Sequence, residues 1–241
     1  MFFPDRYPIG RWNIKELAVQ PTEHSFITPD GVRLHAWLFR SNDANAPLLI
    51  WFHGNAGNIT NRAEMAVELA RRGVSTFLFD YRGFGKSEGQ PTESKVYVDA
   101  LAAYDYVQTL APPKVVLYGE SVGGPYAAYV AKERKGSHAV ILENSFSSLR
   151  DLGNALYAPL PLGWTAPFAM RTSDWLNEAG LPVLVMHGKR DQVIPYRIGR
   201  KLYDDLRVPK ELLTSENAGH SEIPALDAAR YYDAVTRFAR R

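Results

Sequence analysis

The segment GESVG at residues 119–123 places a serine in a G-x-S-x-G motif. An apolar run at residues 114–119 precedes it, and a helical pattern at residues 124–134 follows. A serine on a tight strand-to-helix turn stands exposed, and small residues two positions away on each side let the turn close. The motif therefore predicts that Ser121 is a nucleophile for acyl transfer and that the Val122 amide is one donor to an oxyanion.

A serine hydroxyl is a weak nucleophile and needs a neighbouring base. Of the six histidines, His220 lies in a loop between the last predicted strand and the last predicted helix. It alone combines a loop at the carboxyl edge of the sheet with the chain order nucleophile, acid, base. We therefore expect His220 to be the base.

The acid that orients this histidine is expected between the two in the sequence. Asp191 lies in the turn-rich segment GKRDQVIP at residues 188–195. An ionised carboxylate there can fix the tautomer of His220 and stabilise its imidazolium form. Glu143, which ends a predicted strand, is the alternative. Asp191 is preferred because its loop holds the acid clear of the sheet.

A second oxyanion donor is expected from an early loop at the same edge. The segment HGNAGN at residues 53–58 follows an apolar run, and its glycines let backbone amides face the site. The Asn55 amide is the expected donor, with that of Ala56 as the close alternative. His53 is expected to brace this loop rather than transfer protons.

No cofactor is predicted. The chain has no cysteine, no G-x-x-x-x-G-K-[ST] segment and no H-E-x-x-H segment. Its histidines are scattered at spacings that do not suit a metal. We therefore expect neither a bound nucleotide nor a metal.

The elements that must position these motifs follow from the apolar pattern. Six continuous apolar runs predict strands buried on both faces: residues 47–53, 75–81, 114–119, 139–143, 182–187 and 211–215. The strand pattern is weaker in the last run than in the others. Helical patterns alternate with them: residues 59–72, 92–110, 124–134, 198–206 and 222–240. Strands alternating with helices predict an α/β fold with a parallel sheet and helices on both faces.

Two segments depart from this alternation. Residues 24–28 and 33–39 flank a Pro-Asp-Gly turn and predict an antiparallel hairpin. Residues 147–174 are too long for a simple connection and predict a small helical cap above the carboxyl edge, with a crossover helix as the alternative. Phe146, Leu156 and Trp164 are expected to line an apolar acyl pocket there.

Composition limits the class of protein. The 241 residues are 46% apolar and 22% charged with a formal net charge of +2, which suits one packed domain spanning residues 1–241. Balanced charge argues against a nucleic-acid partner. No apolar run is long enough to cross a membrane, so stable membrane insertion is not expected. We expect a cytoplasmic protein, with Phe2, Phe3 and Trp12 either contacting a bilayer or packing on the domain.

Taken together, the motifs resemble the α/β-hydrolase superfamily over nearly the whole chain. The segments that carry the resemblance are HGNAGN at 53–58, DYRGFGKS at 80–87, GESVGG at 119–124, ENSFSSL at 143–149, GKRDQVIP at 188–195 and GH at 219–220. They look like a branch of small single-domain serine hydrolases related to the bud-emergence and protein-depalmitoylating hydrolases. Eukaryotic members of that branch often carry an anchored or acylated N-terminus, whereas this chain has neither an apolar anchor nor a cysteine.

The resemblance implies an eight-stranded, mostly parallel sheet. It also implies a triad of Ser121, Asp191 and His220, an oxyanion hole formed by the amides of Asn55 and Val122, and hydrolysis of acyl esters or thioesters. The expected partner is a small-molecule or lipid-like acyl substrate, and members are often named esterase, lysophospholipase or thioesterase. An acyltransferase, a small-peptide hydrolase and a receptor-like binding module remain the alternatives.

Overall fold

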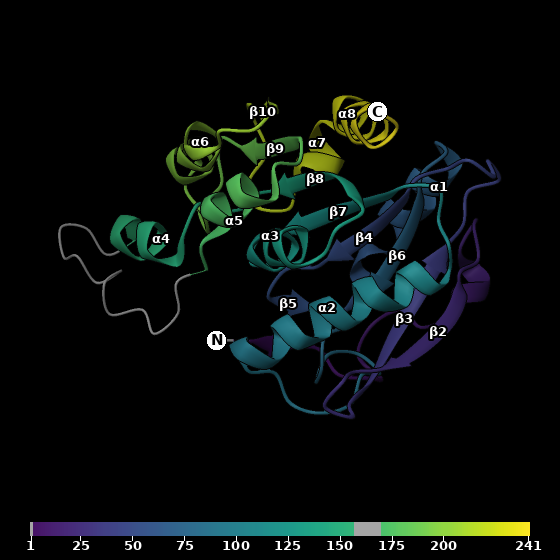
Figure 1. The fold of residues 1–241 in the computed structure, drawn as a ribbon. Helices are drawn as coiled ribbons and strands as arrows, with labels where there is room; N and C mark the ends of the chain where they lie inside the picture. The colour runs from purple at the N-terminus through teal and green to yellow at the C-terminus, as the bar shows by residue number, and fades with distance from the viewer. Residues whose placement is uncertain (1, 157–169) are drawn as a thin grey trace.

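The computed structural model describes residues 2–156 and 170–241, and an eight-stranded sheet forms its centre (Figure 1). The strand order is β10-β9-β8-β7-β4-β6-β3-β2. The strands are β2 (Thr22–Ile27), β3 (Arg33–Phe39), β4 (Leu48–Phe52), β6 (Ser75–Phe79), β7 (Val115–Glu120), β8 (Ser137–Glu143), β9 (Val183–Gly188) and β10 (Lys210–Ser215). All neighbouring pairs from β10 to β6 are parallel, while β3 runs antiparallel to both β6 and β2.

Helices cover both faces of this sheet. They are α1 (Ala63–Arg71), α2 (Glu93–Thr109), α3 (Gly123–Glu133), α4 (Leu149–Leu156), α5 (Thr172–Ala179), α6 (Tyr196–Asp205), α7 (Ile223–Leu226) and α8 (Ala228–Ala239). Two short 3-10 helices, η1 (Ile14–Glu16) and η2 (Ile59–Arg62), precede α1. Figure 1 shows α2 and α3 side by side in front of the sheet. The predicted α/β-hydrolase fold, with its mostly parallel sheet and its hairpin, is confirmed.

The continuous apolar strands are explained by two cores, one on each face. Successive side chains of a strand point to opposite faces. In β4, Ile50 and Phe52 join the core that α2 and α3 cover, whereas Leu49 and Trp51 join the core that α1 and α8 cover. A central strand therefore has no solvent-facing side and shows no polar alternation.

A second, two-stranded sheet was not predicted. It pairs β1 (Phe3–Pro4) in parallel with β5 (Ala56–Gly57), so the N-terminal segment lies against the loop after β4. Phe2 packs edge-on against Phe84 and Trp12 packs against Trp37, while the Phe3 side chain is exposed. Strands of two residues carry no periodic pattern that a sequence could reveal.

The predicted cap falls partly outside the described residues. Within the predicted cap interval, the structure describes residues 147–156, which contain α4, and residues 170–174, which contain the start of α5. The rest of the interval, with Trp164, lies outside them, so the cap stays a prediction, as does the single-domain assignment. Among residues 2–156 and 170–241, no helix has both the length and the apolar character needed to span a membrane.

Candidate active site

Ser121 occupies the turn between β7 and α3 in a strained backbone conformation. Its φ is +54°, in the left-handed region that L residues rarely adopt. The Ser121 amide donates to the Glu143 carbonyl at 2.8 Å, and the Ser145 hydroxyl donates to the Ser121 carbonyl at 2.9 Å. A Cβ on Gly123 would collide with the Phe52 carbonyl, so only glycine lets α3 start this close to β4. Strain held by surrounding structure is typical of functional sites.

The structure brings Ser121, His220 and Asp191 into one chain of hydrogen bonds. Ser121 Oγ lies 3.1 Å from His220 Nε2, and His220 Nδ1 lies 2.8 Å from Asp191 Oδ2. With Nδ1 protonated and donating to the carboxylate, Nε2 is free to accept the serine proton. These side chains come from the turn after β7, the loop after β10 and the loop after β9.

Asp191 is buried and remains ionised. Its Oδ1 accepts hydrogen bonds from the Val193 and Ile194 amides, each at 2.8 Å. Burial alone would raise the pKa of this carboxyl, but hydrogen bonds from His187 and His220 hold the pKa well below its ordinary value. A charged acceptor therefore faces the His220 imidazole.

Glu143, the alternative acid, has a different partner. It ends β8 and accepts a hydrogen bond from the Tyr118 hydroxyl, which also lies 2.6 Å from the Tyr231 hydroxyl. Burial raises the pKa of Glu143 to about 7. In the described structure, the carboxylate within hydrogen-bonding distance of His220 is Asp191, not Glu143.

His187 was not among the predicted site residues. Its Nε2 lies 2.8 Å from the Ile194 carbonyl and 3.4 Å from Asp191 Oδ2, and the side chain is fully buried. The imidazole therefore lies against the oxygen of Asp191 that faces His220. The one signal in the sequence is its place at the end of an apolar run, four residues before Asp191.

The 54–58 loop lies beside the nucleophile, because a Cβ on Gly54 would be 3.5 Å from Ser121 Cβ. His53 Nδ1 lies 2.8 Å from the Gly54 carbonyl. In a trans peptide the carbonyl and the next amide point in opposite directions, so the Asn55 amide points away from the His53 ring. No hydrogen bond from the Asn55 or Val122 amide to another described residue is found. Both amides therefore have no competing partner among the described residues, and their role as oxyanion donors stays a prediction.

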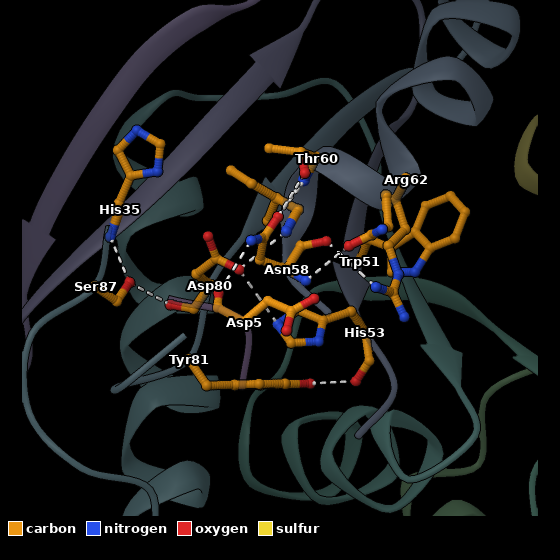
Figure 2. Close-up of polar contacts among 12 residues, drawn as sticks. Asp5, His35, Trp51, His53, Asn58, Thr60, Arg62, Asp80, Tyr81 and Ser87 are labelled. Carbon is orange, nitrogen blue, oxygen red and sulfur yellow. Dashed lines mark hydrogen bonds and ion pairs between the residues drawn. The ribbon is translucent and has the colours of Figure 1, made fainter. Parts of the chain in front are cut away.

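A buried pair of side chains lies behind this loop (Figure 2). His53 Nε2 is 3.7 Å from Asp80 Oδ1, which also accepts from the Ile59 amide. Burial lowers the pKa of His53 to about 3 and raises that of Asp80 to about 8. Near neutral pH the imidazole is uncharged and Asp80 is largely protonated, so the pair brings no ionic charge to the loop.

The three predicted acyl-binding residues have different environments. Phe146 is buried in the core that also contains Val122, the residue after Ser121. Leu156, at the end of α4, is 48% exposed. Trp164 lies outside the described residues. Their role in an acyl pocket stays a prediction.

Comparison with known proteins agrees with the fold and defines the class. The model of the family described as serine aminopeptidase, S33 matches residues 43–176, more than half of the chain. The chain belongs to this hydrolase family, within the α/β-hydrolase superfamily.

Particular relatives extend the similarity to almost the full length. The Mycobacterium tuberculosis protein Rv2307c is 33% identical, covering 99% of this chain and 85% of its own. Protein bem46 of Schizosaccharomyces pombe is 31% identical, covering 81% of this chain and 70% of its own. Among solved structures, Pyrococcus furiosus esterase Pf2001 superposes with a TM-score of 0.81 over 100% of this chain and 98% of its own at 20% identity, which is a likeness of fold.

Proposed function

We propose that this protein is a serine hydrolase that cleaves carboxylic esters or thioesters through Ser121, His220 and Asp191. The observation that carries the proposal is the chain of hydrogen bonds at 3.1 Å and 2.8 Å that joins the three side chains. A serine beside an imidazole that a carboxylate orients is the arrangement needed to activate a hydroxyl.

In the first half of the reaction, Ser121 Oγ forms a bond to the acyl carbon while its proton moves to His220 Nε2. The carbonyl π electrons move onto oxygen, and the amides of Asn55 and Val122 donate to this oxyanion. The start of α3 adds the positive end of a helix dipole at the same place. When the carbonyl re-forms, the carbon–oxygen or carbon–sulfur bond breaks and His220 protonates the leaving group.

In the second half, water attacks the acyl-enzyme. His220 takes a proton from the water, and a second tetrahedral intermediate uses the same two amides. Its collapse breaks the bond to Ser121 Oγ, which regains the proton from His220 and releases a carboxylic acid. We propose a small-molecule or lipid-like acyl group as the substrate.

The proposal is tested by hydrolysis of a series of p-nitrophenyl esters of increasing chain length. Wild-type protein should release p-nitrophenol, and Ser121→Ala should abolish turnover while circular dichroism and thermal unfolding stay unchanged. Near-normal turnover by a folded Ser121→Ala variant would contradict the proposed nucleophile.

Peptide hydrolysis is a second candidate because the matching family is described as serine aminopeptidase. The same triad can protonate an amine leaving group. Aminoacyl p-nitroanilides, compared with p-nitrophenyl esters on the same enzyme, distinguish the two reactions.

A further inference from the structure

Arg62 is a charged side chain buried behind the candidate oxyanion donors. It ends η2, and only 8% of the residue is exposed. Arginine is rarely buried to this degree unless each part of its guanidinium has a partner. The partners of Arg62 divide into two sets that belong to different parts of the candidate site.

The first set belongs to the turn that carries the nucleophile. Arg62 Nε donates to Glu120 Oε2 at 3.0 Å and Nη2 donates to Glu120 Oε1 at 2.7 Å, which is a bidentate pair. Trp51 Nε1 donates to Glu120 Oε2 at 3.1 Å. Glu120 is the residue directly before Ser121, so its position is coupled through the backbone to Ser121 and Val122.

The second set belongs to the 54–58 loop. Arg62 Nη1 donates to the Ala56 carbonyl at 3.0 Å and to the Asn58 carbonyl at 3.2 Å. Figure 2 shows Arg62 and Trp51 next to each other, with Asn58 joined to Arg62. One rigid guanidinium therefore contacts both the loop that holds the Asn55 amide and the residue before the nucleophile.

The geometry points to Arg62 as a positioning residue that sets the separation between the Asn55 and Val122 amides. This inference rests on the proposed function, because the two amides matter only if an oxyanion forms between them. Among the described residues, Arg62 makes no hydrogen bond to Ser121. It acts through Glu120 on one side and through the Ala56 and Asn58 carbonyls on the other.

Lysine cannot replace this arrangement. The planar guanidinium holds its donors in a fixed fork, whereas an ammonium is a single charged centre on a flexible stem. Burial alone would raise the pKa of Glu120, but Arg62 holds that pKa at about 2, so the carboxylate is charged. Arg62→Lys keeps a positive charge beside Glu120 but loses the simultaneous contacts to the two loop carbonyls.

A buried ion pair can matter for stability alone, so a matched control is needed. Arg82 is 1% exposed and pairs with Asp99 and Asp30. It makes no hydrogen bond to the 54–58 loop or to Glu120 among the described residues. Arg82→Lys therefore disturbs a buried arginine pair of similar kind without touching the proposed link.

The experiment compares wild type, Arg62→Lys and Arg82→Lys. It measures kcat and KM for p-nitrophenyl acetate, thermal unfolding, and inhibition by an aryl trifluoromethyl ketone, which forms a tetrahedral oxyanion on serine. We expect kcat of Arg62→Lys to fall about 10- to 100-fold with KM little changed. Affinity for the ketone should fall in parallel, while kcat of Arg82→Lys stays close to wild type.

The inference is overturned if folded Arg62→Lys keeps wild-type kcat, or if both arginine variants lose kcat equally. Glu120→Gln is a nearly isosteric second variant and should shift kcat and ketone affinity in the same direction. If Arg62→Lys does not fold, a wild-type ketone affinity in Glu120→Gln overturns the inference. Absence of Ser121-dependent hydrolysis in the wild type would instead reject the proposed function.

Discussion

Asp191 accepts hydrogen bonds on both carboxylate oxygens. Oδ1 binds two backbone amides, and Oδ2 faces His220 while His187 lies 3.4 Å from the same atom. The amides fix the direction of the carboxylate, so the oxygen that orients His220 has little freedom. At the scale of single residues, the neighbours of Asp191 therefore fix the orientation of its carboxylate toward His220.

Replacing the acid gives a direct comparison between the two candidates. Asp191→Asn should lower kcat by about 10³-fold or more, because an amide neither stabilises the imidazolium nor selects the required tautomer. Glu143→Gln should leave kcat close to wild type, since Glu143 bonds Tyr118 rather than His220. Ester hydrolysis by both variants is the measurement. A large loss in Glu143→Gln with a small loss in Asp191→Asn would reverse the assignment.

At the scale of elements, the loop after β4 is held through four successive carbonyls. Those of Asn55 and Gly57 accept from the Phe3 and Asp5 amides of the N-terminal segment. Those of Ala56 and Asn58 accept from Arg62. Because the carbonyls are occupied in this way, the loop is fixed from the N-terminal segment and from η2 at the same time.

Asn58 joins the N-terminal segment to η2. Its Nδ2 donates to the Asp5 and Ile9 carbonyls, and its Oδ1 accepts from the Thr60 amide as a helix cap. Asn58→Ala should therefore destabilise the protein by about 1–3 kcal/mol through a lost cap and unsatisfied buried groups. Chemical denaturation measures the loss, and hydrogen exchange at the Phe3 and Asp5 amides should become faster.

Asn13→Ala is the control for this prediction, because among the described residues the Asn13 side chain bonds Glu16 alone, at the surface. Equal free energies of unfolding for the two alanine variants, with unchanged exchange at Phe3, would contradict the account of the loop.

How much a sequence can predict depends on the range of the interaction. Ser121, Asp191 and His220 were predicted because each lies in a local motif at the end of an apolar run. The Arg62–Glu120 pair was missed because 58 residues separate its members and neither belongs to a spacing rule. The β1–β5 sheet was missed because two-residue strands have no period.

At the scale of the whole molecule, burial of carboxyl groups couples stability to pH. Burial raises the pKa of Asp80 to about 8 and those of Glu93 and Glu143 to about 7. Such groups keep a proton in the folded state that they lose in the unfolded state above about pH 4. The folded protein therefore binds more protons, and this contribution to stability falls as the pH rises from about 4 to 8.

Asp80→Asn should weaken this dependence. The amide stays neutral across this pH range, and its Oδ1 can accept from the Ile59 amide as the carboxyl oxygen does. We expect Tm to fall less between about pH 5 and pH 9 in this variant than in the wild type. The exposed Glu88→Gln variant should match the wild-type profile. A steeper fall in Asp80→Asn would show that Asp80 is stabilised as the anion.

The central claim is that Ser121 is an activated nucleophile, and covalent labelling tests it most directly. Native protein treated with a fluorophosphonate probe, digested and examined by mass spectrometry should carry one adduct, on Ser121. Labelling should be lost in His220→Ala and after unfolding, because the hydroxyl reacts only while the imidazole takes its proton. A native, folded protein that is not labelled, or is labelled at another residue, would contradict the account.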